Sequence, residues 1–199
     1  KYSDRWIVFI SFIIGLSIGV HLLNLLTIPA ISLIYYFKKY NPTKKGIIST
    51  IIFSFFLLGV IQAVIIPQIP NMAAKFEIFF VNSIGLPFNS GTIIFFALLT
   101  GAILWGIYKS HKNNISLLNL FLVSIVALLI GYSTFFILVI RSNANTPINE
   151  NSPKDAVSLL AYLNREQYGD WPIIYGQYYN TPLDPQQPYK DGNPVYARD

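Results

Sequence analysis

The chain has 199 residues, of which 53% are hydrophobic and only 12% are charged, with a net charge of +5. Soluble domains usually carry about 25% charged residues, so this composition excludes an ordinary soluble globular protein. The absence of cysteine excludes disulfides and thiolate metal sites. The positive charge does not indicate nucleic-acid binding, because the lysines cluster at the ends of apolar runs, as in membrane proteins.

Long uncharged runs predict an all-α polytopic membrane protein, since about 20 apolar residues in a helix cross the hydrocarbon core of a bilayer. The runs are 6–37, 46–74, 78–108 and 113–140. The first run is too long for one upright span and contains Pro29, which removes a helical donor. We therefore expect a hairpin with spans at about 6–24 and 28–40.

Small residues recur every four positions on the first predicted helix, at Ser11, Gly15 and Gly19. This spacing favours close packing against a second helix, because small side chains let two backbones approach each other. A passage for a ligand is the alternative.

The third span is expected at about 46–66, where Pro67 and Pro70 should end it. The next segment, 70–83, carries apolar side chains on one face at helical spacing. This pattern predicts a separate amphipathic helix that lies in the outer membrane interface. The alternative is a helix that packs on the bundle.

Two further spans are expected at about 91–108 and 115–140. Lys and Arg collect before the first span, between the second and third, and after the fourth. Because cytoplasmic segments are enriched in these residues, we expect the N-terminus in the cytoplasm. The transmembrane bundle, 1–141, would then precede an extracytoplasmic segment, 142–199. Since the chain begins at Lys1 without a signal peptide, we expect an internal fragment of a longer protein.

The extracytoplasmic segment is predicted to contain one helix at about 153–166, with Ser152 as its N-cap. Gly169 and Pro172 should end this helix. The rest is rich in Tyr, Pro and Gln, and it is expected to form an irregular loop with a short strand at 173–175.

Two polar side chains lie near the outer end of the first predicted span. His21 and Asn24 are three residues apart and share a helix face. They either hydrogen-bond within the bundle or form the wall of a substrate cavity. A single histidine in the spans is not a metal site, because such sites need three or four ligands.

Arg141 follows the last span, with Asn143, Asn145 and Asn149 close to it in the sequence. An arginine at this place is either an interfacial anchor or part of a site for an anion. Guanidinium binds phosphate through two parallel hydrogen bonds, and lipid phosphates lie at this depth of a membrane. No acidic residue lies within the predicted spans, which argues against a proton-coupled transporter.

Two segments carry a resemblance to a known family. They are 15–30, GLSIGVHLLNLLTIPA, and 140–179, IRSNANTPINENSPKDAVSLLAYLNREQYGDWPIIYGQYY. They resemble the protein O-mannosyltransferase-like membrane family, also called domain of unknown function 2723 or glycosyltransferase family 117. This family looks like a branch of the GT-C fold and includes large bacterial membrane proteins. The resemblance implies a GT-C-like bundle in a bacterial inner membrane, with the C-terminal segment in the periplasm.

The same resemblance implies an inverting glycosyltransferase that moves a sugar from a polyprenyl-phosphate donor to a protein or glycan acceptor on the extracytoplasmic face. Mannose is the candidate sugar, and protein Ser/Thr is the candidate acceptor. The catalytic acidic residue of such enzymes lies in the first outer loop, which we expect upstream of this chain, so no catalytic residue is assigned. No cofactor is evident, and a need for a divalent metal is left open.

The substrate-binding residues are predicted to be Arg141, His21, Asn24, Asn145 and Asn149. Arg141 matches the arginine that follows a helix in the family, and we expect it to clamp the phosphate as negative charge grows on the leaving group. His21 and Asn24 would line the same cavity and hold sugar hydroxyls or an acceptor. The alternative functions are a transporter or flippase module for a lipid-linked or anionic substrate, and a scaffold domain.

Overall fold

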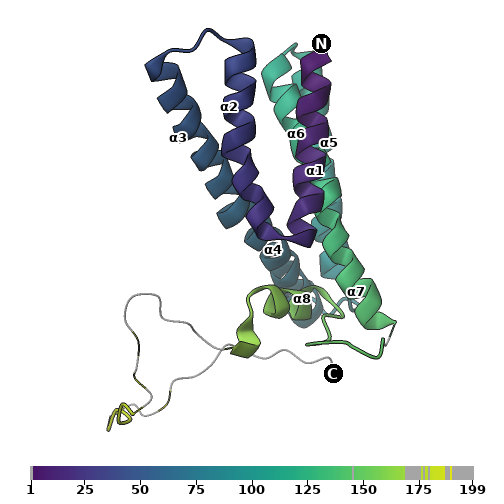
Figure 1. The fold of residues 1–199 in the computed structure, drawn as a ribbon. Helices are drawn as coiled ribbons and strands as arrows, with labels where there is room; N and C mark the ends of the chain where they lie inside the picture. The colour runs from purple at the N-terminus through teal and green to yellow at the C-terminus, as the bar shows by residue number, and fades with distance from the viewer. Residues whose placement is uncertain are drawn as a thin grey trace.

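The computed structural model describes residues 2–144, 146–168, 176, 178, 180–186 and 189. All regular elements in these ranges are helices, and the long ones form a splayed bundle (Figure 1). Helical stretches in the described part that are long and apolar enough to cross a membrane are Lys44–Ser83, Ser90–Lys112 and Ser116–Asn143. The predicted class, an all-α membrane protein, is confirmed.

The first two helices, α1 (Tyr2–Val20) and α2 (Thr27–Lys39), form a hairpin, and a 3-10 turn over Leu22–Leu26 joins them. α1 ends earlier than predicted because His21 adopts an extended backbone, with φ −159° and ψ 121°. Pro29 lies in the first turn of α2, where a residue needs no helical N–H donor. The proline therefore begins the second helix instead of interrupting a single long one.

α1 packs along α6 (Ser116–Tyr132) through glycines on both helices. A Cβ atom on Gly15 would collide with the backbone carbonyl of Leu128, and Gly131 meets the α1 backbone equally closely. A Cβ atom on Gly19 would meet the side-chain hydroxyl of Thr134, which follows α6. The predicted close packing of the small-residue stripe is therefore confirmed at Gly15 and Gly19.

The third predicted span does not end at its prolines. α3 (Lys44–Val60) continues through a π-helical turn into α4 (Ile66–Ile78), and a second π-helical turn extends the helix to Ser83. The result is one helix of 40 residues, so the expected separate helix at 70–83 is wrong. At 1.5 Å per residue, this helix is about 60 Å long, roughly twice the thickness of the hydrocarbon core.

Two features let this helix pass Pro67 and Pro70. The π-helical turn Ile61–Ile65 ends two residues before Pro67, and such turns accommodate irregular backbone hydrogen bonding. Pro70 leaves the carbonyl of Ile66 without its helical N–H donor. The buried Tyr132 on α6 replaces that donor, because its hydroxyl donates a hydrogen bond to this carbonyl at 2.9 Å.

α5 (Ser90–Lys112) begins against the end of α4. Glu77 is only 2% exposed and accepts hydrogen bonds from the backbone N–H groups of Asn89 and Thr92, at 2.5 and 2.8 Å. It also accepts a hydrogen bond from the Thr92 hydroxyl at 2.9 Å. The Glu77 carboxylate therefore caps α5, and its charge faces the positive end of the helix dipole. A Cβ atom on Gly91 would collide with the α4 backbone, so glycine is required at this crossing.

The last predicted span consists of α6, a 3-10 turn over Ser133–Phe135, and α7 (Phe136–Asn143). α8 (Ala156–Leu163) follows a polar loop and packs across α4. In Figure 1, α7 and α8 lie at the end of the bundle opposite to the α2–α3 connection.

α8 starts later than predicted because Asp155, and not Ser152, is its N-cap. The Asp155 carboxylate accepts hydrogen bonds from the backbone N–H groups of Val157 and Ser158, at 2.9 and 2.8 Å. The Ser158 hydroxyl accepts one from the Asp155 N–H in return, at 3.0 Å, which completes a capping box. Ser152 instead has a φ of +41°, a left-handed conformation within the preceding turn.

The core lies where the tip of the α1–α2 hairpin meets the long α3–α4 helix and α6. Its buried members are Ile18, Leu25, Ile28, Ile61, Leu128 and Tyr132. This core fixes the hairpin tip against the two helices that carry the Tyr132 hydrogen bond.

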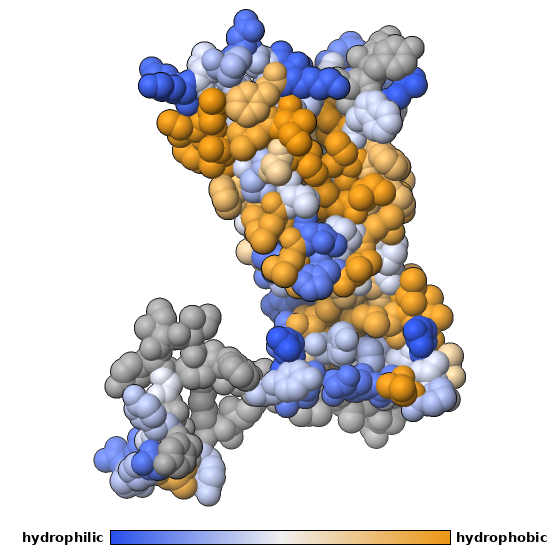
Figure 2. Space-filling model, viewed as in Figure 1, coloured by the Kyte–Doolittle hydropathy of each residue, from blue (hydrophilic) through white to orange (hydrophobic). Residues whose placement is uncertain are grey.

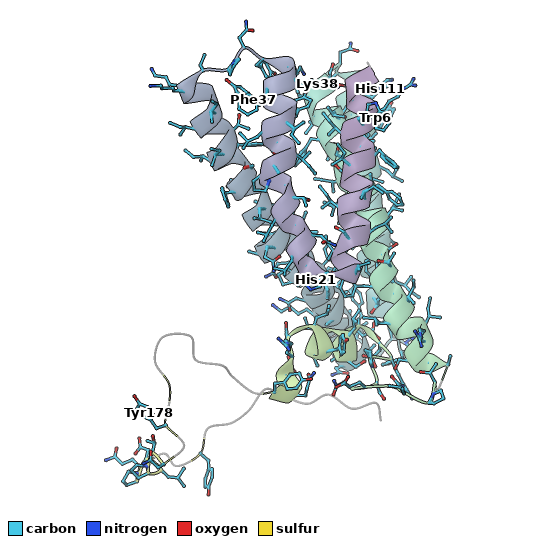
Figure 3. The ribbon with its side chains drawn as sticks, in the orientation of Figure 1. Trp6, His21, Phe37, Lys38, His111 and Tyr178 are labelled. Atoms are coloured by element: carbon cyan, nitrogen blue, oxygen red, sulfur yellow. The ribbon has the colours of Figure 1, made fainter. Side chains whose placement is uncertain are left out.

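Cationic residues collect at one end of the bundle. Figure 3 shows Lys38, His111 and Trp6 at this end, whereas His21 lies at the opposite end of α1. Figure 2 shows a broad apolar band below a hydrophilic rim at the same end. This is the distribution that the positive-inside rule describes; the cytoplasmic location of the cationic end stays a prediction.

Candidate functional site

A groove of about 990 Å³ lies between α5 and the α6–α7 helix. These helices contact each other near the turn that joins them, where the Asn119 amide donates a hydrogen bond to the Ser110 hydroxyl at 3.1 Å. Further from this turn, the groove separates the two helices, and α4 and α8 contribute to its walls.

Helical spacing places one stripe of each helix along the groove. α5 contributes Thr92, Ile93, Phe96, Leu99, Thr100, Ile103 and Leu104, and Asn89 directly before it also lines the groove. The facing helix contributes Val126, Leu129, Ile130, Tyr132, Ser133, Phe135, Phe136, Val139 and Asn143. Between Asn89 and Leu104 the groove follows α5 for about 22 Å, at 1.5 Å per residue, which is most of the ~30 Å hydrocarbon core. Its length and its mostly apolar walls suit a lipid chain.

One end of the groove is polar and is formed by Asn89, Asn143, Lys154 and Asp155; we call it the mouth. Nδ2 of Asn143 donates hydrogen bonds to two carbonyl groups, those of Val139 on its own helix and of Lys154, both at 2.8 Å. Asn143 therefore holds the segment before α8 against the end of α7.

Lys154 is exposed, and it is one of the residues that line the mouth. Within the described part of the chain, its ammonium group has no hydrogen-bond or ion-pair partner. An anion that approaches the mouth from outside would meet this cation.

Arg141 lies on α7 but does not line the groove. Phe136, Val139 and Asn143 are three and four residues apart, so they face the groove together. Arg141 is two residues from both Val139 and Asn143, which corresponds to about 200° around the helix. Its exposed side chain is therefore on the opposite side of α7, and its role as a phosphate clamp stays a prediction.

His21 and Asn24 lie at the exposed tip of the α1–α2 hairpin (Figure 3). Nδ1 of His21 accepts a hydrogen bond from the backbone N–H of Leu23 at 3.2 Å, so the imidazole caps the 3-10 turn. The carbonyl of Asn24 accepts a hydrogen bond from the Thr27 hydroxyl at 2.7 Å. Neither residue lines the groove or is hydrogen-bonded to Arg141, so the structure does not bring these predicted site residues together.

Asn149 folds the polar loop back onto the end of α7. Its Nδ2 donates a hydrogen bond to the carbonyl of Ser142 at 3.2 Å. The Ser142 hydroxyl is buried and has no hydrogen-bond partner in the described part of the chain. Asn145 lies outside the described residues, as does the strand predicted at 173–175.

Two residues that shape the site, Glu77 and Lys154, were not predicted from the sequence. For Glu77, the sequence contains one indication. The first turn of α5 has no acidic residue, so its free backbone N–H groups need an acceptor from another part of the chain. Lys154 was not predicted as a site residue because the helix was expected to begin at residue 153, which placed Lys154 inside it. In the structure, α8 begins only at Ala156. The described residues contain no group of three His, Cys, Asp or Glu side chains that could hold a metal ion.

The N-terminal part of the chain is similar to a known protein family. Residues 1–44 match the family model of the Protein O-mannosyl-transferase TMEM260 N-terminal domain. The matched region comprises α1, the hairpin tip with His21 and Asn24, α2, and the first residue of α3. No curated protein and no solved structure matches the chain. The family match supports a protein O-mannosyl-transferase-like family, and with it a glycosyltransferase-like function for this membrane protein.

Proposed function

We propose that this chain is part of a GT-C-like integral-membrane glycosyltransferase. It would move a sugar, with mannose as the first candidate, from a polyprenyl-phosphate donor to an acceptor hydroxyl. The reaction class comes from the similarity of residues 1–44 to a protein O-mannosyl-transferase domain, and a protein Ser or Thr is the corresponding acceptor. Transfer would take place at the mouth, on the membrane side away from the cationic ends, which makes it extracytoplasmic.

The groove with its polar mouth is the observation that supports a lipid-linked donor. A polyprenyl phosphate has the same division, with a long hydrocarbon chain and an anionic group at one end. Lipid tails are already in an apolar environment, so burial in the groove offers little hydrophobic gain. The groove would therefore orient the chain, and the polar groups at the mouth would select the head group.

The proposed transfer is an inverting substitution at the anomeric carbon of the sugar. The acceptor oxygen forms a bond to this carbon while the bond from the carbon to the phosphate oxygen breaks. A base takes the proton of the acceptor hydroxyl, and a cation stabilises the departing phosphate. The carboxylates of Glu77 and Asp155 both serve as helix caps, so we assign the base to neither.

The proposal is tested with the full-length protein in nanodiscs, by measuring mannose transfer from a polyprenyl-phosphate mannose to a Ser/Thr peptide. Thr100→Trp places a large side chain in the groove, and Thr100 is exposed there, so the core need not rearrange. We expect this variant to lower kcat/KM for the donor at least about tenfold. Leu98→Trp is the matched control, because Leu98 is exposed on the same helix but outside the groove.

Equal effects of the two tryptophan substitutions would contradict a donor chain in the groove. Movement of a lipid-linked sugar across the bilayer, without transfer from any polyprenyl-phosphate sugar, would contradict the transferase. That result would favour the alternative, a transporter or flippase module.

A further inference from the structure

We infer that Lys154 binds the phosphate of a lipid whose hydrocarbon chain lies in the groove, and that Asn143 positions Lys154 for this contact. The inference deepens the proposed function, on which it rests for the class of ligand. It concerns binding alone, so it can hold or fail independently of the transfer reaction.

The position of Lys154 favours a lipid phosphate as its ligand. Lys154 lies at the polar end of the groove, directly before α8, and the apolar stripe of α5 leads away from this end. A lipid chain that fills the groove would therefore leave its head group beside Lys154. Phosphate is the common anionic group that joins such a chain to a head group, and an ammonium group binds it by charge-assisted hydrogen bonds.

The charges around the mouth support the same assignment. Two acidic residues lie near the mouth, and both carboxylates serve as helix caps. Asp155 accepts two backbone hydrogen bonds at the N-terminus of α8, at 2.9 and 2.8 Å, and the buried Glu77 caps α5 through Asn89 and Thr92. The positive end of the helix dipole offsets part of this negative charge. Within the described part of the chain, the Lys154 ammonium has no such partner. An incoming phosphate would thus meet an unpaired cation.

Asn143 explains why a lysine in a loop is held in a defined place. Both hydrogens of its side-chain amide are used, one for the carbonyl of Val139 and one for the carbonyl of Lys154. The first hydrogen bond fixes the amide on α7, and the second ties the backbone of Lys154 to it. Asn149 holds the middle of the loop against the end of α7, because its side chain donates a hydrogen bond to the carbonyl of Ser142. The lysine backbone is therefore attached to the helix that forms one wall of the groove.

Arg141 is the competing cation, since it lies only two residues before Asn143 in the same helix. It faces away from the groove, on the side of α7 opposite to Val139 and Asn143. A phosphate whose chain occupies the groove would have to pass around α7 to reach it. The geometry therefore favours Lys154 for the lipid in the groove.

The test compares two lipids that share a chain and differ in the head group, a polyprenyl phosphate and the neutral polyprenol. Their Kd values are measured on the full-length protein in nanodiscs, and the quantity of interest is the Kd of the polyprenol divided by that of the phosphate. Partial unfolding weakens both lipids alike and leaves this ratio unchanged. The ratio therefore reports contact with the phosphate.

We expect Lys154→Gln to lower the ratio about tenfold or more, as for the loss of a hydrogen bond to a charged group, and Lys154→Arg to restore most of it. Lys112→Gln is the control, because Lys112 is an exposed lysine at the opposite end of α5, and the ratio should not change. Asn143→Ala should lower the ratio several-fold while the Kd of the polyprenol stays within about twofold.

Three results would overturn the inference: a wild-type ratio near one, an unchanged ratio in Lys154→Gln, or a ratio lost only in Arg141→Gln. If Asn143→Ala weakened both lipids equally, Asn143 would be structural only, and its positioning role would be refuted. A ratio that depends on Lys154 in a protein that transfers no sugar would support the inference and contradict the proposed function. Sugar transfer by a protein whose Kd ratio does not depend on Lys154 would contradict the inference and support the proposed function.

Discussion

The hydroxyl of Tyr132 donates a hydrogen bond to the carbonyl of Ile66, at 2.9 Å and across 66 positions of the sequence. Ile66 is the fourth residue before Pro70, so in a regular α-helix residue 70 would donate its N–H to this carbonyl, and proline has no N–H. Tyr132 is only 6% exposed, and a backbone carbonyl that is buried in an apolar environment without a donor destabilises the fold. The contact lets one helix run through its prolines, and both Pro70 and Tyr132 line the groove.

Tyr132→Phe is therefore expected to destabilise the protein, because it leaves the Ile66 carbonyl without a donor. The expected loss is about 1–3 kcal/mol, the cost of an unsatisfied buried acceptor. A fall in the apparent Tm, followed by tryptophan fluorescence in detergent, would measure it.

Pro70→Ala provides the matched background for this experiment, because alanine restores the N–H that the Ile66 carbonyl lacks. In a double-mutant cycle, Tyr132→Phe should cost clearly less in the Pro70→Ala background than in the wild type. The same cost in both backgrounds would show that the Ile66 carbonyl is not what makes the hydroxyl important.

The crossing of α1 and α6 predicts a contrast between two glycines. A Cβ atom on Gly15 would collide with the Leu128 carbonyl, whereas a Cβ atom on Gly101 meets nothing within 4 Å. Gly15→Ala should therefore lower stability by about 1–3 kcal/mol through overpacking. Gly101→Ala should be neutral or stabilising by up to about 1 kcal/mol, because alanine favours a helix. Equal Tm shifts for the two variants would argue against the close crossing.

Glu77 is expected to hold the start of α5 in place. Glu77→Gln removes the charge and turns one acceptor into a donor that faces backbone N–H groups, so at least one of the three hydrogen bonds is lost. The expected loss of stability is about 3 kcal/mol, with faster amide hydrogen exchange at residues 89–92. Glu150→Gln, in the exposed polar loop, is the control and should change neither quantity. Unchanged exchange in Glu77→Gln would remove Glu77 from this role.

Arg141 can be tested in the transfer reaction of the full-length protein. Because it faces away from the groove, we expect Arg141→Ala to reduce transfer less than Lys154→Gln does. A loss of about 100-fold or more, which corresponds to about 2.7 kcal/mol of transition-state stabilisation, would instead make Arg141 the phosphate clamp that the sequence predicts. The apparent Tm of each variant shows whether a loss of transfer reflects a loss of folded protein.

Pro29 and Pro70 show which helix boundaries a local sequence rule predicts correctly in this chain and which it does not. Pro29 lies in the first turn of α2, and the sequence predicted a helix boundary there because the rule for proline at a helix start depends on its neighbours alone. Pro70 obeys the same steric rule, yet α4 continues past it. The reason is a hydroxyl on Tyr132, whose position depends on how α6 packs against α4.

The sequence by itself therefore determined the membrane class, the α1–α2 hairpin and the small-residue stripe on α1, because these follow from composition and from spacing within one segment. Only the tertiary structure decided the passage of one helix through Pro70, the capping of α5 by Glu77, and the place of Lys154 at the mouth. In each of these cases the deciding hydrogen bond joins residues between 11 and 66 positions apart. Such a contact depends on the packing of whole helices, which a pattern within one segment does not specify.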